Sequence, residues 1–211
     1  MREQIKQLLK NSVYRAIGET ANGIGAVDGD GRSLRVLMYH KVNDLAGNRM
    51  SMPVSLFDEQ MAQLKELGYT VVDLDAVLAH YIDGAPLSPG AVLITFDDGY
   101  RDNLVNAAPV LRKHGYQAVQ FVPIAYVGDR QPLPHEEHLA QSRVINRTVD
   151  WSELADLERL GVRIESHGIS HRPLADLELD EAAREITISK LRLEEKLGRE
   201  VRALVDSVLA R

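Results

Sequence analysis

Two adjacent carboxylates, Asp97 and Asp98, follow an apolar stretch in the segment TFDDGY at residues 95–100. Neighbouring residues of an extended strand point to opposite faces, so both acids reach one site only where the chain turns. Gly99 permits such a turn, because glycine adopts backbone conformations that other residues avoid. Alternatively, one acid caps a following helix by accepting hydrogen bonds from its free N–H groups. A single Asp would suffice for a cap, so the pair favours catalytic or metal chemistry.

Two histidines four residues apart, His167 and His171, lie in the segment ESHGISH at residues 165–171. Histidines at this spacing can face the same way on a helical turn, which is a frequent arrangement for a divalent metal. The pair alone is a weak signal, because surface helices also place histidines at this spacing by chance. Together with an aspartate, however, it makes a three-ligand site with positions open to water, which is typical of a catalytic metal.

The remaining histidines compete for the same role. His135 and His138 lie in a polar, proline-containing loop and are expected to be solvated loop residues. His80 and His114 lie near predicted helix ends and are expected to be ordinary surface residues. His40 is either a packed residue at a strand end or a group that supports a nearby metal site.

Short apolar runs alternate with amphipathic segments along the chain. Strands are predicted at residues 34–39, 69–72, 91–96, 117–122, 162–165 and 201–205. Helices are predicted at residues 55–67, 74–81, 103–114, 151–160 and 180–197, with Ser55 and Asp150 as N-caps and a long loop at 123–150. This alternation predicts an α/β fold with a parallel sheet, either doubly wound or a (β/α) barrel. In both folds the chemistry lies at the carboxyl ends of the strands, where His40, the aspartate pair and His167 would converge.

Composition excludes several classes of function. The 211 residues include 25 Lys and Arg against 31 Asp and Glu, a net charge of −6, which argues against a nucleic-acid-binding surface. The absence of cysteine excludes disulfides, zinc fingers and a thiol nucleophile, so any metal must be held by histidines and carboxylates. No apolar run approaches the ~18 residues of a membrane-spanning helix. No secretory signal is recognised either, so the cytoplasm or the membrane periphery is the default expectation for location.

The chain is expected to have three parts. Residues 1–17 place apolar side chains on one helical face among basic residues. Such a helix docks on the protein's own body or on a partner, or it lies on a membrane surface as a peripheral contact. Residues 18–33 form a glycine-rich linker, and residues 34–211 form the domain that carries the motifs.

Several of these segments together resemble the NodB-type polysaccharide deacetylases, which form carbohydrate esterase family 4. The segment LMYHKV at residues 37–42 resembles the opening strand of that domain, and TFDDGY resembles its first catalytic motif. The segment SHGISHRPL at residues 166–174 resembles the metal-binding motif of the family. The segment LGREV at residues 197–201 resembles the approach to its third motif, so the likeness runs from about residue 34 to residue 201.

This resemblance implies a distorted (β/α) barrel, a divalent metal that is usually zinc, and an N-acetylated polysaccharide or oligosaccharide as substrate. It implies that Asp97 is the general base and that the backbone N–H near Tyr100 helps to stabilise the oxyanion, with His40 as a further candidate contact. The implied metal ligands are Asp98, His167 and His171.

The chain also departs from the family pattern. The family's late histidine, which supplies the general acid, is missing, because His171 is the last histidine of the sequence. A complete (β/α) barrel takes ~250 residues, so we expect a C-terminally truncated, incomplete barrel with impaired turnover. The alternative is a non-catalytic remnant or pseudoenzyme that binds a glycan or a protein partner. If turnover persists, His40 or a loop histidine must serve as the acid. A further departure is Glu165, where the family has a small residue and where a carboxylate either perturbs the site or faces away.

Overall fold

The computed structural model describes residues 33–45, 48–128, 133 and 147–207. The predicted helix at residues 1–17, nearly all of the predicted linker and the loop histidines His135 and His138 lie outside these ranges. Within the described residues, no helix combines the length and the apolar character that a membrane crossing requires.

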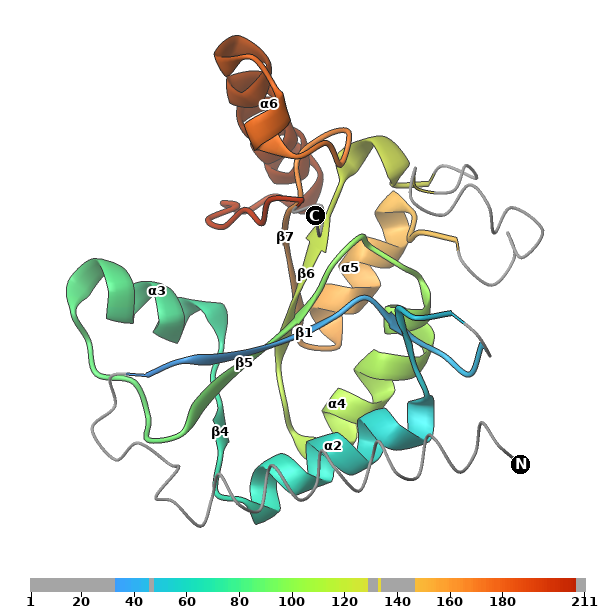
Figure 1. Cartoon of the computed structure of the whole chain (residues 1–211), viewed down its shortest axis with the longest axis vertical. Coiled ribbons are helices and arrows are strands. Elements are labelled where there is room, and N and C mark those ends of the chain that lie inside the picture. The colour runs from blue at the N-terminus through green and yellow to red at the C-terminus, as the bar shows by residue number, and fades with distance from the viewer. Residues whose placement is uncertain (1–32, 46–47, 129–132, 134–146, 208–211) are drawn as a thin grey trace.

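The predicted parallel sheet is confirmed (Figure 1). Its strands run in the order β1 (Arg35–Tyr39), β5 (Ala91–Phe96), β6 (Ala118–Val122) and β7 (Val162–Ser166), and β4 (Thr70–Val71) pairs with the start of β5. All of these pairings are parallel, so the carboxyl ends of the strands meet at one edge. A second, two-stranded sheet joins β2 (Lys41–Val42) to β3 (Ser51–Met52), which the sequence analysis did not predict.

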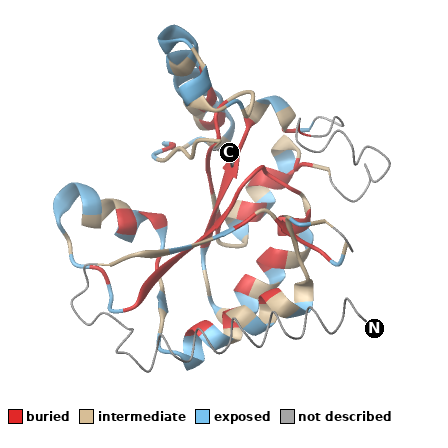
Figure 2. Cartoon of the chain, in the orientation of Figure 1, coloured by how far each residue is buried: buried red, intermediate tan, exposed pale blue. Residues whose placement is uncertain are grey.

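Strand β5 is buried along its whole length, as its red ribbon in Figure 2 shows. Burial on both faces is typical of a parallel strand with cover on each side, and it explains the continuous apolar run AVLITF. The alternate side chains of the strands belong to two different cores. The outer cluster lies under four helices and includes Phe57, Met61, Ile94, Phe96, Leu111, Val122, Leu154, Leu157, Ile164 and Leu193. The inner cluster lies on the opposite face and contains Val72, Leu74, Val77, Leu87, Ala91, Leu93, Val119 and Phe121.

The predicted helices are confirmed with small shifts at their ends. They are α2 (Val54–Glu66), α3 (Leu74–Asp83), α4 (Ala108–His114), α5 (Trp151–Arg159) and α6 (Leu179–Leu197), and two short 3₁₀ turns lie at Ile124–Tyr126 and Leu174–Asp176. Asp150 caps α5 as predicted, and it forms a capping box with Glu153. The predicted cap at Ser55 is wrong, because α2 begins one residue earlier and follows Pro53 without a side-chain cap.

The predicted helix at 103–114 begins instead as a π-helix, η1 (Asn103–Ala107), which continues into α4. Pro109 has no backbone N–H and cannot donate to the carbonyl of Val105, so the regular i to i−4 ladder is interrupted there. The side chains of Asn103 and Asn106 donate to the carbonyls of His40 and Val42, at 3.0 and 2.8 Å. The irregular turn therefore ties the end of β1 to the segment that follows the aspartate pair.

The predicted strand at 201–205 is only partly present. Ser166 donates to the carbonyl of Ala203 at 3.2 Å and accepts from Val205 at 3.1 Å, which makes a single parallel bridge beside β7. The N–H groups of Arg202 and Ala203 bond to the Glu165 side chain, so no longer ladder forms. Among the described strands no pairing joins β1 to this segment, and the barrel is not closed.

Three aromatic rings lock the carboxyl ends of β1 and β5 to α2. The ring of Phe57 lies 5.1 Å from that of Tyr39 in an edge-to-face arrangement and 5.9 Å from that of Phe96. Because His40 and Asp97 directly follow Tyr39 and Phe96, this packing fixes where the two strands deliver those side chains.

We predict that Phe57→Ala lowers the free energy of unfolding by about 3–5 kcal/mol, because it leaves a cavity at a fully buried position. The matched control is Tyr81→Ala, which removes an aromatic ring that is 68% exposed and should change stability by no more than about 0.5 kcal/mol. Denaturant unfolding measures both values, and equal losses in the two variants would contradict this account of the core.

Candidate metal centre

Asp98, His167 and His171 each offer one ligand atom to a common point, and these atoms lie within 4.8 Å of one another. The Nε2 atoms of His167 and His171 lie 3.5 and 2.8 Å from Oδ1 of Asp98. The two imidazole rings meet edge to face, with centroids 4.7 Å apart. The structure thus brings together the three residues that the sequence analysis selected as ligands.

Asp98 reaches this point because its backbone turns sharply. Its φ is 71°, in the left-handed region that non-glycine residues rarely adopt, and Gly99 continues the turn with a φ of 70°. A Cβ on residue 99 would lie 3.1 Å from Cγ1 of Val122, so the tight space and the positive φ both favour glycine there. Consecutive residues of a strand point to opposite faces, and this turn allows the side chains of Asp97 and Asp98 to reach the same site.

The two histidines converge for a different reason than predicted. They do not lie on a helical turn, because residues 167–171 form an irregular loop after β7. Gly168 and His171 both adopt positive φ, at 76° and 60°, and these two turns bring the rings together. Ile124 and Ala125 donate to the carbonyls of Gly168 and Ile169 at 3.1 and 3.0 Å, which fixes the loop from the side of β6.

Glu185 of α6 holds the same loop from its other side. Its carboxylate accepts hydrogen bonds from the backbone N–H of Ile169 at 2.5 Å and of Ser170 at 3.0 Å, and from the Ser170 hydroxyl at 2.6 Å. A Cβ at Gly168 would lie 3.0 Å from Oε2 of Glu185, so the glycine makes room for this contact. The loop between the histidines is therefore bonded through its carbonyls and through its N–H groups.

A hydrogen bond sets the protonation pattern of His167. Its Nδ1 lies 3.0 Å from the carbonyl oxygen of Val205, which can only accept, so the ring proton resides on Nδ1. Nε2 is then unprotonated in the neutral ring and presents its lone pair toward Asp98. Metal-binding histidines are oriented in this way by an acceptor behind the ring.

The electrostatics of the two aspartates differ. Burial alone would raise the pKa of Asp98, but the imidazoles of His167 and His171, whose Nε2 atoms face its carboxylate, outweigh burial when they are protonated and hold this pKa well below its usual range. Burial raises the pKa of Asp97 above that of an ordinary carboxyl group, although His167 and His40 oppose the shift. Asp98 is thus held in the ionised form that a metal ligand requires, and Asp97 is poised to exchange a proton.

The donor set fits a divalent metal ion. Two imidazole nitrogens and one carboxylate oxygen are the ligands that zinc takes in catalytic sites, with a fourth position left for water or substrate. Oδ1 of Asp97 is buried beside this set and has no hydrogen-bond partner among the described residues. A polar atom buried without a partner is costly, so a bound water or ion beside it would satisfy the site.

His40 lies on the opposite side of Asp97 from the histidine loop. Strands β1 and β5 pair with Tyr39 opposite Phe96, so His40 follows directly beside Asp97. The charge of His40 opposes the rise in the pKa of Asp97 that burial causes, and it contributes to the lowered pKa of Asp98. The half-buried side chain therefore lies near the same polar cluster, which favours a group at the site over a packed strand end, and its role remains a prediction.

Behind the site lies a buried polar group that the sequence analysis did not predict. The ammonium group of Lys41, a fully buried residue, lies 4.3 Å from the centre of the Tyr100 ring, and Asn43 donates to the carboxylate of Asp102. Burial raises the pKa of Asp102 to about 6 against the opposing effects of Asn43 and Lys41. Tyr100 is itself fully buried, so its ring is not available to a substrate, and a role for its backbone N–H remains a prediction.

The model of the polysaccharide deacetylase family matches residues 84–205 of the chain, which include both the aspartate turn and the histidine loop. The chain belongs to the polysaccharide deacetylase family. The NodB-type resemblance predicted from the sequence is therefore confirmed. Members of this family generally depend on a metal, which agrees with the donor set described above.

Two relatives illustrate how much of a family member this chain represents. "Putative polysaccharide deacetylase YxkH" of Bacillus subtilis (strain 168) is 34% identical over 158 residues, which cover 74% of this chain and 50% of that protein. Poly-beta-1,6-N-acetyl-D-glucosamine N-deacetylase of Escherichia coli (strain K12) is 35% identical over 85 residues, 39% of this chain and 13% of that protein. The chain thus matches at most half the length of these two relatives.

Solved structures confirm the fold class. The Streptococcus pyogenes deacetylase PplD in complex with acetate superposes with a TM-score of 0.68 at 20% identity, over 82% of this chain and 73% of its own. IcaB from Ammonifex degensii gives a TM-score of 0.69 at 22% identity, over 83% and 74%. The distorted (β/α)-barrel type predicted from the sequence is therefore the fold type of this chain.

The sequence analysis did not predict the residues that support the proposed ligands, although one pattern could have indicated some of them. Glu185 and Ser189 share a buried stripe of α6 with Leu193 at four-residue spacing. Polar residues on the apolar face of a helix usually have a partner inside the protein, so this stripe was the available signal. Lys41 and Val205 carry no comparable signal in the sequence.

We predict that the purified chain binds about one zinc ion, and that His167→Ala combined with Asp98→Ala abolishes this binding, because two of three ligands are lost. The control is His114→Ala, which breaks a histidine–carboxylate pair with Asp58 away from the site and should leave the metal content unchanged. Elemental analysis after dialysis measures the content, and equal content in the wild type and the double variant would refute the site.

A second prediction concerns Asp102, whose pKa is about 6 in the folded chain against 3.8 for an ordinary aspartate. Between these values the folded state retains a proton that the unfolded state has released, so this group's contribution to stability falls as the pH rises. Between pH 4 and pH 7 the free energy of unfolding of Asp102→Asn should therefore fall by about 2 kcal/mol less than that of the wild type. Exposed Asp83→Asn is the control, and parallel curves for the wild type and Asp102→Asn would contradict the shift.

Proposed function

We propose that this chain is a metal-dependent hydrolase that removes N-acetyl groups from the amino sugars of a polysaccharide. The observation that carries the proposal is Asp97, a buried carboxylate with a raised pKa beside a set of three convergent ligands. Such a pair of unlike acids assigns two roles: Asp98 binds the metal and Asp97 moves a proton.

The proposed ligands are Asp98, His167 and His171, and zinc is the proposed ion. When bound, a divalent metal supplies Lewis acidity, which polarises an amide carbonyl and makes water more acidic. The chain's own residues supply the remaining functions. Asp98 and His171 would bind the ion from two backbone turns with positive φ. The ring of His167 is aligned by its hydrogen bond to the carbonyl of Val205.

Asp97 is proposed as the general base. Its raised pKa brings the carboxylate closer to neutral pH than an ordinary aspartate, which favours proton transfer from water during attack on the amide. The backbone N–H of Tyr100, which follows the turn at Gly99, is proposed as a hydrogen-bond donor to the developing oxyanion.

His40 is proposed as the general acid that protonates the departing amine. The sequence analysis lacked a residue for this step in the family's late motif. Support for His40 comes from its position beside Asp97 and from the hydrogen bond that Asn103 donates to its carbonyl, which fixes the backbone. Deacetylation requires a base that activates water and an acid that protonates the departing amine.

The proposed substrate is a polymer that contains N-acetylglucosamine. This choice rests on the Escherichia coli relative, whose name specifies poly-β-1,6-N-acetyl-D-glucosamine.

We predict that the zinc-loaded chain releases acetate from N-acetylglucosamine oligomers, and that Asp97→Asn lowers kcat by about 10²–10⁴-fold while the metal content is unchanged. His40→Gln should lower kcat to a similar degree, because the leaving amine is no longer protonated. The rate of acetate release, measured as a function of pH, tests the loss of kcat in both variants.

His80→Gln is the control, because His80 bonds to the carbonyl of Ala85 at the end of α3, outside the polar cluster. No turnover by the metal-loaded wild type would overturn the proposal and favour the non-catalytic, glycan- or partner-binding alternative. The impaired turnover expected from the sequence remains a prediction, which the same assay tests against a full-length relative.

A further inference from the structure

Glu165 is a fully buried carboxylate on β7, two residues before His167. Burying a charged carboxylate is costly unless it is paired and hydrogen-bonded. Both of its oxygens have partners: Oε1 accepts from Arg163 at 2.7 Å and from Arg199 at 3.3 Å. Oε2 accepts instead from two consecutive backbone N–H groups, those of Arg202 at 2.7 Å and Ala203 at 2.8 Å.

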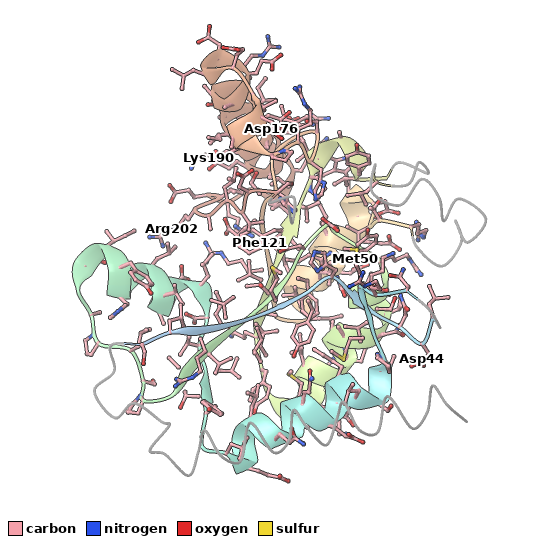
Figure 3. All side chains as sticks on the ribbon, in the orientation of Figure 1. Asp44, Met50, Phe121, Asp176, Lys190 and Arg202 are labelled. Atoms are coloured by element: carbon pink, nitrogen blue, oxygen red, sulfur yellow. The ribbon has the colours of Figure 1, made fainter. Side chains whose placement is uncertain are left out.

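These two N–H groups belong to the segment at residues 201–205, which lies beside β7. The Val201 end of this segment is held separately by α6, where Lys190 donates to the Val201 carbonyl at 2.7 Å and Glu194 accepts from the Val201 N–H at 3.0 Å. Only Ser166 forms ladder hydrogen bonds with the segment, to Ala203 and from Val205. Ala203 and Val205 also pack on the inner cluster that includes Phe121, which is labelled in Figure 3. Apolar packing selects which face of the segment is buried, but hydrogen bonds are needed to fix its position along β7.

The same segment delivers the acceptor for a proposed ligand. The carbonyl of Val205 lies 3.0 Å from Nδ1 of His167 and directs the opposite ring nitrogen toward Asp98. A continuous chain of contacts therefore runs from Glu165 through the N–H groups of residues 202 and 203 to Val205 and His167. No hydrogen bond joins Glu165 to Asp98, His167 or His171 among those of the described residues, so any influence on the site passes through this segment.

We propose that Glu165 is a positioning residue of the metal centre, which fixes the 201–205 segment so that the Val205 carbonyl holds His167 with its proton on Nδ1. This inference rests on the proposed metal centre. It gives a role to the residue that departs from the small side chain of the family pattern. The carboxylate does not face the ligands; it acts on the backbone that orients one of them.

The surrounding ion pairs offer a matched control. Arg199 also bonds to Glu158 of α5, at 2.7 Å through Nε, and Arg202 pairs with Asp75 of α3 at 3.2 Å, with its side chain labelled in Figure 3. Glu158 binds the same arginine as Glu165, but no hydrogen bond of the described residues joins it to the backbone of residues 202 and 203. Glu158→Gln thus weakens the ion-pair network without removing the acceptor of the two N–H groups.

Two conservative variants of Glu165 distinguish the effect of the position of its oxygen atoms from the effect of its charge. Glu165→Gln keeps an oxygen at the right distance for the N–H groups but loses the charge that Arg163 and Arg199 neutralise. Glu165→Asp keeps the charge but withdraws the oxygens by one methylene. The readouts are zinc affinity, by competition with a chelating dye, and the ring tautomer of His167 in the metal-free chain, by long-range ¹H–¹⁵N NMR.

We expect Glu165→Asp to weaken zinc binding by about 10–100-fold and to lose the preference of the His167 proton for Nδ1. Glu165→Gln and Glu158→Gln should keep both properties near the wild type, even where their unfolding midpoints fall. Affinity and tautomer that follow the charge, retained in Glu165→Asp and lost in Glu165→Gln, would overturn the proposal. So would no change in either variant, or equal losses in both.

If Glu165→Asp fails to fold, Glu165→Gln still decides, because a lost tautomer preference in that variant overturns the proposal. A wild-type chain that binds no zinc would overturn the metal centre. The tautomer of His167 is measured without metal and would still report whether Glu165 positions the ring, so the two failures are distinguishable.

Discussion

The carboxylate of Asp98 is the contact on which the arrangement of the site depends, because it meets two histidines that come from a different part of the sheet. Asp98 follows β5, whereas His167 and His171 follow β7, and β6 lies between these strands. The side chains must therefore meet across the end of β6. The backbone turns sharply after β5 and again after β7, which brings them within reach of one another. The positive φ values of Asp98 and His171 are the means by which the fold achieves this.

Much of the surrounding structure serves to keep these turns in place. Glu185 binds the N–H groups of the histidine loop, and the start of the 3₁₀ turn after β6 binds its carbonyls. On the side of β5, the π-helical turn fixes the carbonyl of His40 through Asn103. The loop and the end of β1 therefore have their polar backbone groups assigned to particular partners, which is what holding ligands in register requires.

The sequence predicted the elements and the three convergent residues, because strand alternation and motif spacing are local signals. The same signals misjudged the local geometry. The histidine spacing suggested a helical turn, whereas an irregular loop with two positive-φ residues brings the rings together. The predicted strand at residues 201–205 forms a single bridge, because its N–H groups bond to the Glu165 side chain, a long-range contact that no local pattern encodes. Lys41 became visible as a supporting group only when tertiary contacts were known, whereas the polar stripe of α6 could have indicated Glu185.

The two left-handed residues also shape how this chain can change over evolutionary time. Asp98 and His171 are the two non-glycine residues with positive φ among those that the structure describes, and both are proposed ligands. Such conformations cost on the order of 1–3 kcal/mol each, so folding strain is concentrated on the residues that function needs. Selection for thermal robustness alone would favour glycine at both positions and erase the ligands. The aspartate and histidine of this chain therefore mark a conflict between stability and chemistry that is confined to two residues.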